Sequence, residues 1–137
     1  MNRLFAIILL LFSCNHSTAP FISDFVVISY SSQCCGVPSD KPLLSAIKQF
    51  KRAHNIKVIK GAIITNIGDE GEIEYVLNLQ PLNEKQKNEF IKELYKLTKP
   101  RLLFKEPGSV GVNESHVKYW NELQTEKSHR NIAKTDF

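Results

Sequence analysis

The sequence lacks the short motifs that identify many catalytic and cofactor-binding sites. It contains no H-E-x-x-H for a zinc protease and no G-x-S-x-G for a serine hydrolase. The "GSVG" at residues 108–111 has neither the Lys-Ser/Thr of a phosphate-binding P-loop nor the spacing of a dinucleotide fingerprint, so we expect a plain loop there. These absences favour a non-catalytic protein, and they predict no cofactor.

The chain also has little excess charge of either sign. Its 18 basic and 14 acidic residues give a net charge of +4, and a chain starting at residue 14 would lose only Arg3, leaving 17 − 14 = +3. Nucleic-acid-binding domains carry a much stronger basic footprint, so nucleic acid is not expected as a partner. No internal repeat is visible, and about 120 residues suffice for one domain with one core.

A long hydrophobic run is missing as well. The apolar run from Leu4 to Phe12 has nine residues, whereas a membrane-spanning helix needs about 20. The run follows Arg3 near the start of the chain and gives way to the polar "NHSTAP". This layout is typical of an export signal.

The end of the run, "LFSC" at Leu11 to Cys14, resembles the lipobox of bacterial lipoproteins. A leucine stands three residues before the cysteine and a small serine directly before it. The resemblance implies that residues 1–13 are a signal peptide and that Cys14 is lipidated, so that the membrane is a partner through an N-terminal anchor. Asn15 is not the acidic residue that commonly retains such proteins at the inner membrane, so the outer membrane, facing the periplasm, is the expected location.

The rest of the chain is expected to form one α+β domain. Residues 14–23 are polar and predict a tether, followed by a domain over 24–127 and a frayed tail over 128–137. The expected order of elements is strand, helix, strand, strand, helix, strand, helix. This order matches the two-layer ferredoxin-like βαββαβ sandwich plus a C-terminal helix. The alternative is a looser α+β domain in which residues 101–106 are unpaired.

Hydrophobic periodicity places these elements along the chain. The expected strands cover residues 25–28, the two arms around a turn at 68–71, and 101–106. The expected helices cover residues 39–55, 83–100 and 114–127.

The first helix has clear boundary signals. Ser39 or Asp40 can cap its start, Pro42 is tolerated in its first turn, and Asn55 is a suitable stop. Its buried stripe is expected to contain Leu43, Leu44, Ile47 and Phe50. The basic residues of this segment are expected on the solvent-exposed side of the helix or in its last turn, where cations complement the helix dipole. They are Lys48, Lys51 and Arg52.

The second helix and the strand before it are also well patterned. Asn83 and Gln86 predict a capping box. The helix stripe is expected to contain Phe90, Ile91, Leu94 and Leu97. In the strand, the residues expected to face inward are Ile73, Tyr75, Leu77 and Leu79, and those expected to face outward are Glu72, Glu74, Asn78 and Gln80. Such alternation predicts a sheet with one buried face.

Few other polar residues suggest a catalytic pair. Glu114 and His116 lie two positions apart, and such positions do not face each other on a helix. His54 is expected at the surface of a helix end and His16 in the tether.

The adjacent Cys34 and Cys35 are the remaining candidates for chemistry. If Cys14 carries lipid, they are the only thiols left, so they have no distant disulfide partner. Neighbouring Cα atoms lie about 3.8 Å apart, whereas relaxed disulfides need about 4.4–6.8 Å, so a bond between them would be strained. In small ferredoxin-like metal chaperones a Cys-x-x-Cys occupies the equivalent loop, but here no residues separate the cysteines. Free thiols, a vicinal disulfide, an intermolecular bridge and a bound soft metal ion such as Cu(I) all remain open.

Two functions follow from these observations. The first is a small lipid-anchored cell-envelope protein that acts as a non-catalytic binding or interaction module, with another envelope protein as a candidate partner. The alternative is a thiol-redox or soft-metal-binding envelope protein that works through Cys34 and Cys35. The sequence does not reveal a ligand or an oligomeric state.

Overall fold

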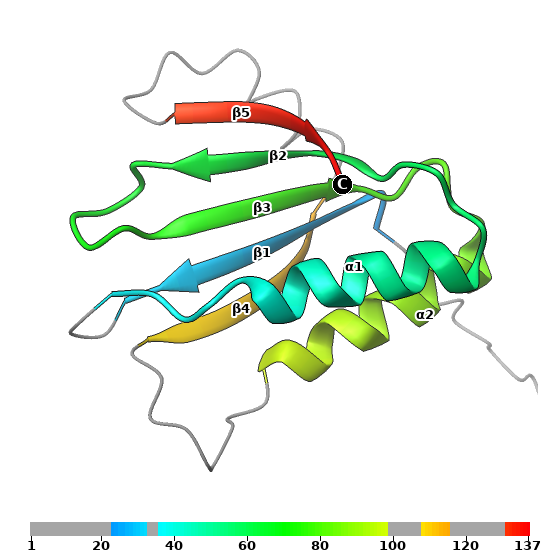
Figure 1. Ribbon diagram of the computed structural model, residues 1–137, viewed down its shortest axis with the longest axis horizontal. Coiled ribbons are helices and arrows are strands. Elements are labelled where there is room, and N and C mark those ends of the chain that lie inside the picture. Colours follow the sequence, from blue (N-terminus) through cyan, green and yellow to red (C-terminus); the bar gives the residue numbers. More distant parts are fainter. Residues whose placement is uncertain (1–22, 33–35, 99–107, 116–130) are drawn as a thin grey trace, which may run out of the picture.

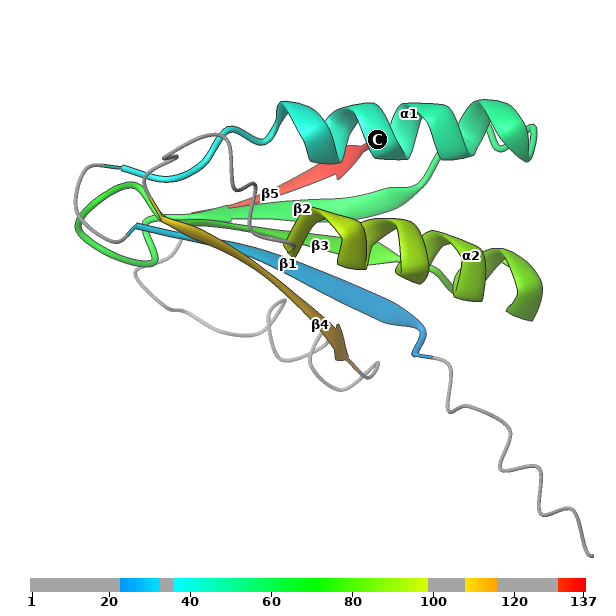
Figure 2. The same cartoon turned by 90° about the horizontal axis from the view of Figure 1, so that it is seen from below.

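The computed structural model describes residues 23–32, 36–98, 108–115 and 131–137. They form an antiparallel sheet with two helices on one of its faces (Figures 1 and 2). The elements are β1 (Phe25–Ser31), α1 (Lys41–Ala53), β2 (Lys60–Thr65), β3 (Ile73–Asn78), α2 (Glu84–Tyr95), the 3-10 helix η1 (Lys96–Thr98), β4 (Ser109–Ser115) and β5 (Asn131–Asp136). The predicted α+β class is confirmed.

The sheet has five strands in the order β4-β1-β3-β2-β5, and every neighbouring pair is antiparallel. In the centre of the sheet Val27 lies opposite Val76, and at one edge Ile63 lies opposite Ala133. None of the helices in the described part of the chain is long and apolar enough to cross a membrane.

Helix α1 begins and ends close to the predicted residues. Asp40 is its N-cap residue, but its side chain makes no capping hydrogen bond, because its carboxylate accepts a hydrogen bond from the Tyr75 hydroxyl instead. Asn55 ends the helix in the left-handed conformation, with φ of 53°. The Ile56 N–H donates to the Lys51 carbonyl at 2.9 Å, which closes the last turn in the way of a Schellman motif.

The predicted stripe of α1 is right at three positions and wrong at one. Leu43, Ile47 and Phe50 are buried, whereas Leu44 is 41% exposed. Leu43 and Leu44 are neighbours, so they point about 100° apart around the helix, and only Leu43 faces the sheet.

Helix α2 is confirmed at its start, but it ends at Tyr95 and gives way to η1, so Leu97 of the predicted stripe lies outside it. The Asn83 side chain accepts from the Gln86 N–H at 2.9 Å, and the Gln86 side chain accepts from the Asn83 N–H at 3.1 Å. This is the predicted capping box. Phe90 and Leu94 are fully buried, and the Phe90 ring stacks on Phe50 of α1 with ring centroids 4.4 Å apart. The two helices are therefore joined to each other as well as to the sheet.

The prediction of a sheet with one buried face is wrong at its centre. Besides the core beneath the helices, the opposite face carries a second cluster of buried residues: Phe25, Val27, Ile64 and Val76. The physical reason is that the inner strands carry β-branched or aromatic residues at successive positions, the pattern of strands buried on both faces. The polar side of β3 is confined to its ends, where Glu74 accepts from the Ser29 hydroxyl at 3.1 Å.

The C-terminal part of the chain departs most from prediction. The expected loop at 108–111 is wrong, because Ser109–Ser115 form β4, and this strand includes the first two residues of the helix expected at 114–127. The expected frayed tail over 128–137 is also wrong for residues 131–136, which form β5 against β2. The expected strand at 101–106 and residues 116–127 lie outside the described residues.

A charged pair ties the end of α2 nearest the capping box to the start of β1. The Lys87 ammonium lies 2.8 Å from Asp24 Oδ1, and its side chain is only 8% exposed. Glu84 approaches the same ammonium at 3.7 Å from a mostly exposed position. Lys87 therefore depends mainly on Asp24 for compensation of its buried charge.

The Tyr75 hydroxyl should ionise at a higher pH than the hydroxyl of an ordinary tyrosine. Burial, followed by the hydrogen bond to Asp40 and its charge, raises the pKa of the hydroxyl well above 10.0. The folded state then holds this proton more tightly than the unfolded state, so the stabilisation is present below pH 10 and is lost as the pH rises through the folded pKa. In a spectrophotometric titration we expect Tyr75 to stay protonated at about pH 11.

The Tyr75→Phe variant serves as the control for this titration. It should lose the late-titrating component and keep the earlier ones. An unchanged late component in Tyr75→Phe would show that another tyrosine is responsible.

Candidate functional site

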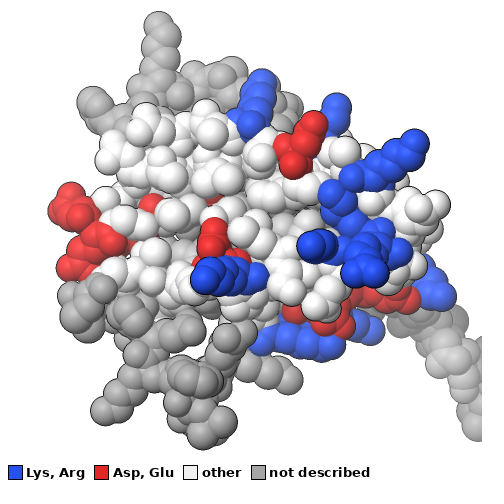
Figure 3. Space-filling model, in the orientation of Figure 1, with Lys and Arg blue, Asp and Glu red and all other residues white. Residues whose placement is uncertain are grey.

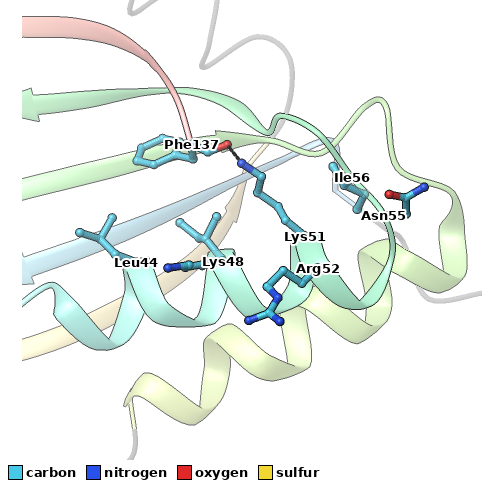
Figure 4. A pocket seen from close by; sticks show the side chains of 8 residues that line it. Leu44, Lys48, Lys51, Arg52, Asn55, Ile56 and Phe137 are labelled. Carbon is cyan, nitrogen blue, oxygen red and sulfur yellow. Dashed lines mark hydrogen bonds between the residues drawn. The ribbon is translucent and has the colours of Figure 1, made fainter.

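A groove of about 590 Å³ lies between α1 and the end of β5 (Figure 4). Its apolar lining comes from both sides: Leu44, Ile47, Ile56 and Phe137. The volume falls within the 300–1,000 Å³ typical of small-molecule sites. We define this cavity as the α1–β5 groove.

The wall formed by Phe137 is fixed by backbone pairing. The Phe137 N–H donates to the Ile59 carbonyl at 2.9 Å, and the Ile59 N–H donates to the Phe137 oxygen at 3.2 Å. Beneath the ring lies Gly61, where a Cβ atom would come within 2.8 Å of a ring carbon and 2.2 Å of the Val76 oxygen. The absence of a side chain at Gly61 therefore creates the space that Phe137 occupies.

The polar lining of the groove is basic. It consists of Lys48, Lys51, Arg52 and Asn55. Lys51 reaches across the groove and its ammonium donates to the Phe137 backbone oxygen, whereas the Arg52 guanidinium turns away from Phe137 (Figure 4). Among the described residues, neither Lys48 nor Arg52 has an ion pair or a side-chain hydrogen bond.

The two helices differ sharply in how their charges are balanced. Helix α1 has four basic residues and no acidic residue, whereas α2 has three lysines and three glutamates. In α2 the charges pair locally, as in the i,i+4 contact of 4.0 Å between Lys85 and Glu89. In α1 the i,i+4 pair is Lys48 and Arg52, two like charges, which is a destabilising arrangement.

This imbalance is visible on the surface of the molecule. In Figure 3 several basic side chains gather around the end of α1 with some acidic side chains beside them, and a further group of acidic side chains lies at the opposite end of the same face. The turn between β2 and β3 at that opposite end carries the exposed Asp69 and Glu70. The α1–β5 groove therefore lies beside the group of basic side chains at the end of α1.

A second hollow, of about 530 Å³, lies between α1 and α2. His54 Nε2 lies 3.2 Å from Glu89 Oε2, and the His54 ring packs 4.3 Å from the Phe50 ring. Lysines and glutamates of α2 line this hollow together, so its charges offset one another. We therefore take the α1–β5 groove as the stronger candidate site.

The residues predicted from sequence for lipidation and thiol or metal chemistry lie outside the described part of the chain. These are Cys14, Cys34 and Cys35. The residues flanking the cysteine pair are described: the Gly36 N–H donates to the Ser32 hydroxyl oxygen at 3.2 Å, and that hydroxyl donates to Glu70. Within the described residues no three His, Cys, Asp or Glu side chains are placed to share a metal ion.

Of the other sequence candidates, the structure describes Glu114 and Glu72. Glu114 lies on β4 and accepts only a long 3.5 Å hydrogen bond from Tyr95, and its sequence neighbour His116 is outside the described residues. Glu72 accepts from the Glu70 N–H at 3.1 Å and closes the turn between β2 and β3. The acidic residues near this turn therefore have local structural roles.

Sequence reasoning missed the groove itself. Its basic residues were predicted as a wet helix face, and Phe137 was assigned to a frayed tail. The one available signal was the complete absence of acidic residues from α1.

No protein-family model matches the chain, and no curated protein or solved structure matches it.

Proposed function

We propose that this protein is a small lipid-anchored component of the bacterial cell envelope that works as a non-catalytic binding module. The observation that carries the binding role is the α1–β5 groove, a basic and partly apolar cavity with unpaired lysine charge. The anchor rests on "LFSC" at Leu11 to Cys14.

We further propose that the fold is ferredoxin-like, extended by one strand. The first six elements run β1-α1-β2-β3-α2-β4, and the first four strands are ordered β4-β1-β3-β2. In this view β5 is an addition at the β2 edge. It brings Phe137 beside α1, so the addition to the fold also builds the groove.

The lipid anchor is tested by expressing the full chain in a bacterium that processes lipoproteins and supplying an alkyne-labelled palmitate. We expect label at Cys14, a mature chain starting at that residue, and recovery in the membrane fraction. Cys14→Ser should lose the label, whereas Cys34→Ser with Cys35→Ser should keep it. A wild-type chain that remains unlabelled, or that starts at another residue, would refute the anchor.

A further inference from the structure

We propose that the α1–β5 groove binds one small amphipathic anion, a carboxylate carried on an apolar aryl or alkyl body. The carboxylate would lie between the ammonium groups of Lys48 and Lys51, and the apolar body against Leu44 and Phe137. This inference rests on the proposed binding function and names the chemical class of its ligand.

The charge of the ligand follows from the unpaired cations. Lys48 and Arg52 repel each other across one helical turn, and neither has an ion pair with an Asp or Glu side chain among the described residues. Lys51 and Arg52 gain some stabilisation from the helix dipole because they lie in the last turn. Lys48 lies before that turn and its side chain is exposed, so an anion entering the groove would meet an ammonium with no competing side-chain partner among the described residues.

Lys51 is held in a position from which it can bind an oxygen atom. Its ammonium donates to the Phe137 oxygen, and a lysine ammonium has three donors in total. Two donors therefore remain for a ligand. The contact also orders the lysine side chain in advance, which lowers the entropy cost of binding.

The apolar body of the ligand is inferred from the apolar side chains that line the α1–β5 groove. Leu44 is one of the few large apolar side chains that are more than a third exposed in the described chain, at 41%. Ile56 and Phe137, which line the groove with it, are also only partly buried. Covering these surfaces with an apolar group is favourable in proportion to the area removed from water.

The shape of the site favours a discrete molecule over a flat surface. The apolar residues line a concavity of about 590 Å³, whereas the surface of an anionic bilayer would meet only the exposed rim. A neutral ligand would fill the concavity but leave the like charges uncompensated. The geometry therefore points to a small anion with an apolar body.

The inference is tested with the full lipidated chain in phosphatidylcholine vesicles, by equilibrium dialysis against 4-phenylbutyrate. The neutral 4-phenylbutan-1-ol provides the matched ligand, and vesicles without protein provide the background. We expect saturable binding of one phenylbutyrate per chain, and binding of the alcohol about tenfold weaker because it cannot form charge-assisted hydrogen bonds.

Two lysine variants on α1 provide a matched pair. Lys48→Glu should weaken phenylbutyrate binding about tenfold. Lys41→Glu makes the same charge change on the same exposed helix but outside the groove, and it lies about 10 Å away along the helix axis, so it should change the affinity less than about twofold. Leu44→Ser should weaken the binding of both ligands several-fold without unfolding the domain.

Three results would overturn the inference: no saturable phenylbutyrate binding, equal affinity for the alcohol, or equal losses in the two lysine variants. If phenylbutyrate fails to bind while Lys48→Glu reduces adhesion to phosphatidylglycerol vesicles, the charges serve the membrane surface instead. Labelling of Cys14 is measured independently of ligand binding, so failure of the ligand class and failure of the anchor remain distinguishable.

Discussion

Phe90→Ala should lower the free energy of unfolding by about 3–5 kcal/mol, the largest effect expected from one substitution in the described domain. Phe90 is fully buried and stacks on Phe50, so it joins α1 to α2 over the sheet. Its removal leaves a cavity at the point where both helices meet. Because small domains are stable by about 5–15 kcal/mol in total, much of the chain should unfold well below the wild-type urea midpoint.

Tyr95→Ala is the matched control for this prediction. It removes an aromatic side chain from the same helix, but Tyr95 is 42% exposed, so the expected loss is about 1 kcal/mol or less. Urea titration followed by circular dichroism measures both variants. Similar losses in the two variants would show that the stacked Phe50–Phe90 contact does not organise the core.

Asp24→Ala should destabilise the domain by about 2–3 kcal/mol. The substitution removes the carboxylate 2.8 Å from the Lys87 ammonium and leaves a lysine that is 8% exposed without its main partner. The effect should fall below that of a fully buried pair, because the Asp24 side chain is 38% exposed and Glu84 remains 3.7 Å away. The urea midpoint again provides the measurement.

The double variant Asp24→Ala with Lys87→Met shows how much of the lost stability comes from losing the ion pair and how much from leaving the Lys87 charge buried without a partner. Methionine keeps most of the apolar stem of Lys87 and removes the ammonium, so the double variant should recover much of the stability lost in Asp24→Ala. A double variant as unstable as the sum of the single variants would argue against the buried-charge explanation.

The parts of the fold that sequence predicted well are those governed by local interactions. The capping box of Asn83 and Gln86 joins residues three apart, and Asn55 ends α1 through hydrogen bonds within one turn. The buried strand at Phe25 was recognised from its continuous apolar run. Each of these signals depends on neighbours in the chain and is therefore present in the sequence itself.

The parts that sequence did not predict depend on distant partners. In β5 only Ile132 packs against a buried cluster, while Ala133, Lys134 and Asp136 are exposed, so its composition resembles that of a polar tail. Its strand conformation comes from hydrogen bonding to β2. In β4 the glycines suggested a loop, although Gly111 pairs with Ser29 of β1.

The candidate site was unpredictable for the same reason. Lys51 and Phe137 are 86 residues apart, yet their contact helps define the groove. Sequence spacing placed the basic residues of α1 correctly on its exposed side, but it gave no indication that an apolar wall faces them. A groove made by one helix and a late edge strand is visible only when the sheet is assembled.

The pairing of β2 with β5 also has a consequence for how the protein folds. Lys60 of β2 lies opposite Asp136 of β5. The outer edge of β2 therefore stays uncovered until a segment 76 residues further along the chain has been synthesised. Contacts so distant in the chain form slowly, and an open strand edge readily pairs with another chain. Residues 131–137 of a neighbouring copy carry the same strand, so we expect exchange of β5 between two molecules to compete with correct folding.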